Sequence, residues 1–184
     1  MIHRLNALSG AERDDALTAL ERIFFASSLR RTFADNAARA AFFATWTGWY
    51  VRRAPQDVLL WRDPHDFSDD GPDDGPDDCG WAGYLTGCRD SAGAAELFRT
   101  IPLYDRFSDL FAAFPAHLHV NVDETRRGLG IGAALVAAFV QDCRTGVHVV
   151  TGAGARNRTF YLRCGFSQEV ERDGLLFMGR PATK

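Results

Sequence analysis

The feature that most constrains this chain is a glycine-rich junction, the stretch RRGLGIGAAL at residues 126–135. It follows the apolar run HLHVNV and leads into a long apolar stretch that predicts a helix. Three glycines, Gly128, Gly130 and Gly132, occupy alternate positions at this strand-to-helix junction. Because glycine costs backbone entropy on folding, their concentration indicates either a sharp turn or a close approach of another group to the backbone.

Three kinds of functional junction place glycines after a strand. A dinucleotide fingerprint requires a third glycine where Leu135 stands, and a P-loop requires a lysine that this stretch lacks. The third kind is a pyrophosphate cradle, in which backbone N–H groups at a helix N-terminus bind the anion and Arg126 and Arg127 add positive charge. From the spacing alone, a tight turn with a close helix–sheet contact and solvated arginines is an equally good interpretation.

Length and composition limit which folds and which binding partners are possible. The 184 residues, 46% of them apolar and 12% aromatic, predict a single domain over residues 1–184 with a sizeable core. The net charge of −3, without a Lys/Arg stripe, argues against a nucleic-acid partner. No run is long enough to span a membrane and no signal peptide is found, so a cytoplasmic location is expected. The cysteines lack C-x-x-C spacing and indicate reduced, mostly buried thiols: Cys79, Cys88, Cys143 and Cys164.

Hydrophobic periodicity predicts helices and strands that build one mixed sheet. Strands are expected over residues 2–5, 57–63, 81–90, 116–122, 146–152 and, as a closing hairpin, 166–180. Helices are expected over 9–29, 35–53, 132–144 and 157–165, with one or two short helices in an insert at 91–115. Asp173-Gly174 marks the turn of the hairpin. This order predicts an α/β fold in one domain.

Two local patterns refine the first two helices. Ser9 and Glu12 have the spacing of a capping box at the start of the first helix. Phe42, Trp46 and Trp49 share one face of the second helix, which is typical of a core stripe, with a substrate wall as the alternative.

The composition changes abruptly between residues 63 and 80, where eight Asp, three Pro and three Gly form repeated DDGP. Because like charges repel and few apolar groups offset the ordering entropy, this stretch predicts a mobile loop between two strands. Calcium ligation is one alternative, although the spacing is not that of an EF-hand, and attraction of a cationic substrate is another. No metal site is therefore expected.

The C-terminal half resembles the GNAT family of N-acetyltransferases. Arg127-x-x-Gly130-x-Gly132 is similar to the family's acyl-CoA motif, Arg/Gln-x-x-Gly-x-Gly/Ala, and FYLRCGF is similar to its Tyr-x-x-x-Gly-Phe segment. The resemblance covers residues 116–179 and implies a GNAT-like fold with a mixed, mostly antiparallel central sheet flanked by helices. The stretch FPAHLHVNVDETRRGLGIG further resembles the acetyltransferase-like domain of O-GlcNAcases and its stand-alone bacterial relatives, which carry Asp where this chain carries Asn121.

The resemblance implies acetyl-CoA as the cofactor. The backbone of the junction would bind its pyrophosphate through Arg127, Gly128, Leu129, Gly130, Ile131, Gly132 and Ala133. Val120 and Val122 would pair with the pantetheine arm as if it were an added strand, and Asn157 would contact that arm with its side chain.

Acetyl transfer to an amine needs a base for the amine and a proton or hydrogen bond for the departing thiolate. The resemblance implies that Tyr161 donates the proton or hydrogen bond to the departing thiolate. The alternative is that Tyr161 is a core aromatic residue whose hydroxyl forms a hydrogen bond with a neighbouring group. Period-two alternation places His117, His119 and Asn121 on one face of their strand. His119, nearer the glycines, is the first candidate base and His117 the second, with satisfied core histidines as the alternative. Asn121 can only donate or accept hydrogen bonds.

The sequence therefore predicts an acetyl-CoA-dependent N-acetyltransferase whose acceptor is a small-molecule or protein amine. The alternative, favoured by Asn121, is a catalytically weak acyl-CoA-binding module with a sensing or partner-recognition role. A purely structural α/β domain is the third interpretation. Dimers are common among the proteins that this chain resembles, so a homodimer is compatible with the resemblance.

Overall fold

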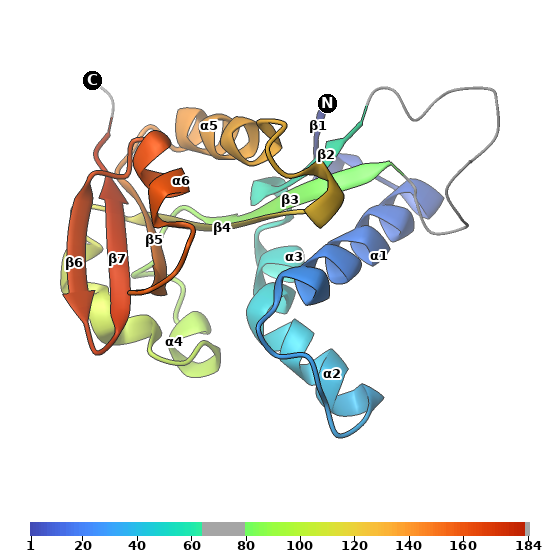
Figure 1. The fold of residues 1–184 in the computed structure, drawn as a ribbon, viewed down its shortest axis with the longest axis horizontal. Coiled ribbons are helices and arrows are strands. Elements are labelled where there is room, and N and C mark those ends of the chain that lie inside the picture. Colours follow the sequence, from blue (N-terminus) through green and yellow to red (C-terminus); the bar gives the residue numbers. More distant parts are fainter. Residues whose placement is uncertain (64–79, 183–184) are drawn as a thin grey trace. The chain divides into compact units, whose positions relative to one another are not determined.

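The computed structural model describes residues 1–63 and 80–182; the acidic stretch predicted as a loop falls, with Cys79, outside the described residues except at its two ends. The described strands form one seven-stranded sheet (Figure 1). In sheet order they are β1 (Ile2–Arg4), β2 (Val58–Arg62), β3 (Trp81–Cys88), β4 (Ala116–Val122), β5 (Val147–Gly152), β7 (Leu175–Arg180) and β6 (Gln168–Arg172). β4 and β5 run parallel, whereas the β1–β2, β2–β3, β5–β7 and β6–β7 pairs are antiparallel. The expected mixed, mostly antiparallel sheet is confirmed.

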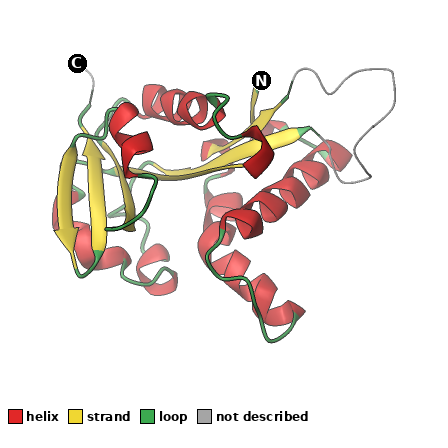
Figure 2. Ribbon diagram, viewed as in Figure 1, coloured by secondary structure: helices red, strands yellow, loops and turns green. Residues whose placement is uncertain are grey.

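The chain groups into two compact units. The first consists of Met1–Thr86 and Val120–Leu135, and the second of Gly87–His119 and Val136–Lys184. The described residues of the first unit include the helices α1 (Gly10–Ser27), α2 (Asn36–Phe43) and α3 (Trp49–Arg53) (Figure 2). The second holds α4 (Leu97–Thr100) and α6 (Arg158–Arg163), and the helix after the glycines, α5 (Ile131–Cys143), begins in the first unit and ends in the second.

In the first unit, α1 buries one face through Ala16, Ala19, Leu20 and Ile23, the spacing that an amphipathic helix requires. The predicted capping box is wrong, because the Ser9 side chain makes no cap hydrogen bond. The first helical residue, Gly10, has φ +53°, so the chain enters the helix in a left-handed conformation that does not present Ser9 to the first-turn amides. At α2 the carboxylate of Asp35 does cap the helix, accepting from the Ala38 N–H at 2.7 Å.

The second predicted helix contains a π-helical turn at Ala44–Gly48 between α2 and α3. The extra residue in this turn rotates the following face, so that Thr47 and Tyr50 are buried. The aromatic stripe of Phe42, Trp46 and Trp49 is therefore only half-buried, and its prediction as a core face is wrong. The hydroxyl of Thr47 donates to the Phe43 carbonyl at 2.7 Å, a back-bond that favours such a distortion.

In the second unit, the insert at 91–115 contributes much of the core. Phe107, Phe111 and Phe114 cluster with Phe177 of β7. Glycine is required at the closing hairpin, because Asp173 and Gly174 have φ +50° and +75°, the left-handed pair of a tight hairpin turn. The predicted hairpin turn is confirmed, and residues 91–115 contain α4 and a 3-10 helix at Tyr104–Leu110.

Three of the four cysteines lie in the described residues; Cys88 is buried, whereas Cys143 and Cys164 are only half-buried. No helix in residues 1–63 or 80–182 has the length and apolar character needed to cross a membrane. Within the same residues, no group of three or more His, Cys, Asp or Glu side chains is arranged to hold a metal ion.

Candidate functional site

The glycine-rich junction forms a sharp elbow, here defined as residues 123–133, between β4 and α5. A short 3-10 turn at Glu124–Arg126 leaves β4, and α5 begins at Ile131. Gly128 and Gly130 have φ +84° and +81°, a region that L side chains rarely adopt. A Cβ at either position would meet nothing within 4 Å, so no group of the described residues fills the space beside these two glycines. The glycines thus serve the turn and leave the backbone open to an approaching group.

The elbow presents a run of unpaired backbone donors. The first helical hydrogen bond of α5 runs from the Ala134 N–H to the Gly130 carbonyl at 3.0 Å. Within the part of the chain that the structure describes, no backbone acceptor pairs with the N–H groups of residues 128–133. The Arg127 N–H, predicted to be part of this set, instead donates to the Glu124 carbonyl at 3.4 Å. Six donors beside open space, at the N-terminus of a 13-residue helix, fit an anion such as a diphosphate.

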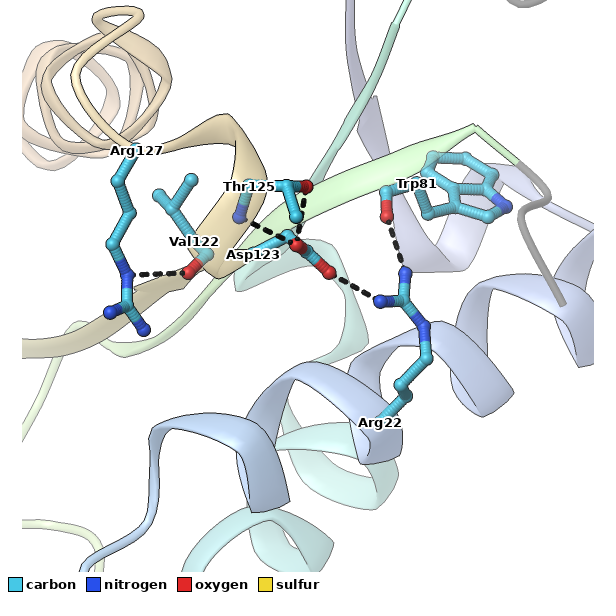
Figure 3. A network of polar contacts seen from close by, with 6 residues as sticks. All are labelled: Arg22, Trp81, Val122, Asp123, Thr125 and Arg127. Atoms are coloured by element: carbon cyan, nitrogen blue, oxygen red, sulfur yellow. Dashed lines mark hydrogen bonds and ion pairs between the residues drawn. The ribbon is translucent and has the colours of Figure 1, made fainter. Parts of the chain in front are cut away.

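The two arginines before the glycines are engaged with the protein itself. Arg126 forms an ion pair with Asp63 at 3.1 Å, so the solvated arginines of the tight-turn alternative are not found at this residue, and the positive charge expected for the cradle is paired with a carboxylate. The Nε of Arg127 donates to the carbonyl of Val122 at 3.2 Å (Figure 3). One lone pair of the carbonyl expected to pair with the pantetheine arm is therefore already used by Arg127.

Gly83 of β3 brings the sheet close to the start of α5, and sequence reasoning missed it. A Cβ on Gly83 would lie 3.1 Å from Ile131 Cγ2, 3.2 Å from the Asn121 carbonyl oxygen and 3.4 Å from Val122 Cγ2. Only a residue without a side chain lets these groups pack as closely as they do. The available signal was a glycine inside the otherwise apolar strand WAGYLTG.

Asn121 pairs with a buried tyrosine that the sequence did not suggest. Its Nδ2 donates to the Tyr84 hydroxyl oxygen at 2.8 Å. Tyr84 is 1% exposed, and burial raises its pKa, an effect that the hydrogen bond from Asn121 only partly opposes. Both side chains are therefore neutral at physiological pH, so this pair cannot supply a carboxylate base.

In the second unit, His117 is a satisfied core histidine. It is buried, and its Nδ1 lies 2.8 Å from the Ser91 hydroxyl and 3.3 Å from the Tyr104 hydroxyl. Burial lowers the pKa of His117 well below its usual value, and the neighbouring His148 adds to this effect. The local partners favour the alternative that the sequence left open for this residue, a histidine fixed for packing.

His119 has a different environment on the same strand. It is half-buried, and within residues 1–63 and 80–182 no hydrogen bond to its ring is found. Burial lowers its pKa, so the imidazole is neutral at pH 7 and has a lone pair to accept a proton. These properties are those that a general base needs.

Tyr161 and Asn157 lie at α6 of the same unit. The Tyr161 side chain is 5% exposed and packs edge-on against Phe160 and Phe166. Among the described residues, no hydrogen-bond partner is found for its hydroxyl, and burial raises its pKa. Asn157 is exposed, and its Oδ1 accepts from Thr151 Oγ1 at 3.1 Å. The backbone joins the two residues, since the Tyr161 N–H donates to the Asn157 carbonyl at 3.1 Å.

The structure thus assembles the predicted residues as two groups. The first unit contains the open amides of the elbow together with Val120, Asn121 and Val122. The second contains the two histidines of β4 and the Asn157–Tyr161 turn.

The fold and the elbow define a class of protein: this chain has the fold of the GNAT acetyltransferases, as the sequence motif implied. The crystal structure of SsHAT is similar with a TM-score of 0.68 at 21% identity, over 100% of this chain and 98% of SsHAT. PH1933 from Pyrococcus horikoshii OT3 is similar with a TM-score of 0.65 at 12% identity, over 100% of this chain and 99% of that protein. The sequence matches no family model and no curated protein.

One of the similar structures contains the expected cofactor. A GNAT superfamily phosphinothricin acetyltransferase from Sinorhizobium meliloti, solved in complex with acetyl-CoA, has a TM-score of 0.54 at 16% identity. The match covers 99% of this chain and 88% of that enzyme. At these identities the likeness concerns the fold, and the chemistry of this chain has to be argued from its own residues.

Proposed function

We propose that this protein is an acetyl-CoA-dependent N-acetyltransferase. The observation that carries the proposal is the elbow: six backbone N–H groups without a backbone partner among the described residues, beside two glycines whose Cβ positions are open. Such a cradle binds the diphosphate of a CoA thioester without any side chain, helped by the partial positive charge of the α5 N-terminus.

When bound, acetyl-CoA supplies a thioester whose carbonyl carbon an amine attacks, with a C–N bond forming as the C–S bond breaks. His119 would accept the proton that leaves the amine nitrogen, because its ring is neutral at pH 7 and no hydrogen bond to it is found within residues 1–63 and 80–182. Tyr161 keeps its proton at neutral pH and donates a hydrogen bond to the sulfur. Because the pKa of a phenol lies above that of a thiol, Tyr161 stabilises the thiolate rather than neutralising it. His119 would then release its proton to solvent, and the thiolate would take up one proton from solvent to leave as the thiol, so the reaction balances.

The Asn121–Tyr84 pair supports a second candidate function, a weakly catalytic acyl-CoA-binding module. A neutral amide bonded to a neutral phenol cannot take a proton from an ammonium group. In such a module, ligand binding at the elbow would serve sensing or partner recognition.

Release of free thiol in the presence of amines separates the two functions. The protein is incubated with acetyl-CoA and, in turn, an ε-amine, an α-amine, an amino sugar and a polyamine, while thiol and acetylated product are both quantified. An acetyltransferase releases thiol and acetylated amine in equal amounts with at least one of these classes. Binding of acetyl-CoA without amine-dependent thiol release across the panel would favour the binding module, and no binding at all would refute both.

A further inference from the structure

Asp123, the first residue after β4, is the centre of a polar network in the first unit (Figure 3). One carboxylate oxygen, Oδ1, accepts from the Thr125 N–H at 3.1 Å and from its hydroxyl at 2.8 Å. The backbone N–H of Asp123 donates to the Ala82 carbonyl of β3 at 2.9 Å. The Arg126 N–H in turn donates to the Asp123 carbonyl at 3.0 Å, so this one residue connects the 3-10 turn of the elbow to the sheet.

The other carboxylate oxygen of Asp123 accepts from Arg22, which comes from the middle of α1. The second terminal nitrogen of Arg22 donates to the Trp81 carbonyl of β3 at 3.2 Å. Arg22 therefore bridges the start of the elbow and the strand beneath it with the two arms of one planar guanidinium. Its Nε is buried and has no hydrogen-bond partner among the described residues. Burying this unpaired donor costs folding free energy.

We propose that Arg22 is a positioning residue for the cofactor: by holding Asp123 to β3, it fixes the elbow in the form that presents its open amides. This inference rests on the proposed function, since it assigns to the elbow the binding of acetyl-CoA. Arg22 touches no reacting atom, and its contribution is to remove conformational freedom before the ligand arrives.

The chemistry of the elbow explains why it needs such a residue. Gly128 and Gly130 restrict the backbone less than any other residue, so an untethered elbow would sample many conformations. Ordering it on binding would reduce affinity, whereas an elbow already ordered binds without that loss. Burial alone would raise the pKa of Asp123, but hydrogen bonds from Thr125 and Arg22 outweigh it and lower that pKa. The carboxylate is therefore ionised at neutral pH, and its bond to the guanidinium is charge-assisted.

The test compares Arg22→Met, Arg22→Lys and Asp123→Asn with the wild-type protein. The matched control is Arg39→Met, which removes another ion pair of an α1 residue, that between Arg39 and Glu21. Hydrogen exchange of the ligand-free protein is measured at the amides of Asp123, Thr125 and Arg126, which are hydrogen-bonded within the network. Affinity for acetyl-CoA is measured by calorimetry, and KM and kcat are measured with saturating amine.

For Arg22→Met we expect about tenfold faster exchange at these three amides and about tenfold weaker binding of acetyl-CoA, which is about 1.4 kcal/mol. The KM for acetyl-CoA should rise by the same factor while kcat at saturation is unchanged, a split that general destabilisation would not produce. The exchange rates and acetyl-CoA affinity of Arg22→Lys should lie between those of the wild type and of Arg22→Met, because a single ammonium cannot replace both arms of the guanidinium. Arg39→Met should leave exchange and affinity at wild-type values.

Unchanged exchange at the three amides in both Arg22→Lys and Asp123→Asn would overturn the inference, even if Arg22→Met failed to fold. Equal effects of Arg22→Met and the Arg39→Met control would also overturn it, by showing a loss of global stability. If wild-type protein binds no acetyl-CoA, the proposed function is refuted, and the exchange rates alone then decide whether Arg22 orders the elbow.

Discussion

Replacing Gly130 by glutamate tests the cradle most directly. Gly130 has φ +81°, and a Cβ there would meet no atom of residues 1–63 or 80–182 within 4 Å. The new side chain would therefore be accommodated sterically in the free protein, and its cost would be the backbone strain of an L-residue in the left-handed region, about 1–2 kcal/mol. Its carboxylate would extend into the space where the diphosphate is proposed to lie.

The expected effect on binding is larger than the strain. Two unit charges 4 Å apart repel by about 4 kcal/mol at an effective dielectric constant of 20, which lowers affinity by more than a hundredfold. Acetyl-CoA at a hundred times its Kd stabilises the wild-type protein by about 2.7 kcal/mol, and in a domain of this size that raises Tm by about 5–11 °C. At the same concentration, Gly130→Glu should show a ligand-induced shift of about 1 °C or less.

A thermal-shift titration with acetyl-CoA measures both quantities, and Gly174→Glu is the matched control. Gly174 has φ +75° and equally open space, but it lies in the turn of the β6–β7 hairpin rather than in the elbow. In the absence of ligand, both variants should lose about 2–8 °C in Tm, because they share the same backbone strain. Only Gly174→Glu should retain the full shift with acetyl-CoA. If Gly130→Glu retains it as well, the cradle has been placed at the wrong part of the chain.

Three further predictions concern the second unit. Tyr161→Phe should lower kcat about tenfold or more with little change in acetyl-CoA affinity, because only the departing sulfur needs the hydroxyl; steady-state kinetics with unchanged kcat would remove this role. His119→Ala should lower kcat/KM about a hundredfold and abolish the acidic limb of its pH profile, and a wild-type profile that is flat below pH 7 would count against any histidine base. Burial lowers the pKa of His148 to about 4, so His148 alone should make the folded protein about 2 kcal/mol less stable at pH 5 than at pH 7.5, because the unfolded histidine, with a pKa near 6.5, takes up its proton first. The lowered pKa values of His117 and His119 add to this loss. Urea denaturation at both pH values checks this loss, which should shrink in His148→Phe if His148 is its source.

Sequence reasoning succeeded where a local pattern alone determines the backbone. Asp173-Gly174 adopts the left-handed pair of a hairpin turn, and Gly128 and Gly130 have positive φ, as fits the sharp turn that was one of the two interpretations of the glycines. Each of these features is encoded within a few adjacent residues, so no knowledge of distant partners was needed.

Sequence reasoning failed where the structure depends on a partner distant in the sequence or on a local irregularity of a helix. The ion pair of Arg126 joins it to Asp63, and nothing in RRGLGIGAAL reveals that partner. The partner of Asn121 is Tyr84, which became identifiable only once β3 and β4 were adjacent in the sheet. The aromatic stripe was misplaced because a π-helical turn shifted the helical period by one residue, a change too subtle for a periodicity argument.

The polar face of β4 holds three residues that the sequence ranked only by position and side-chain chemistry, and the structure adds the hydrogen-bond partners of each. Alternation places His117, His119 and Asn121 on one face, but their partners differ. His117 is held by Ser91 and Tyr104, and Asn121 is bonded to Tyr84, so each already has a neutral partner. His119 is the member of this face for which the described residues provide no hydrogen bond. The proposal that His119 is the base therefore rests on elimination along one strand, and a His119→Ala variant that kept full activity would refute it.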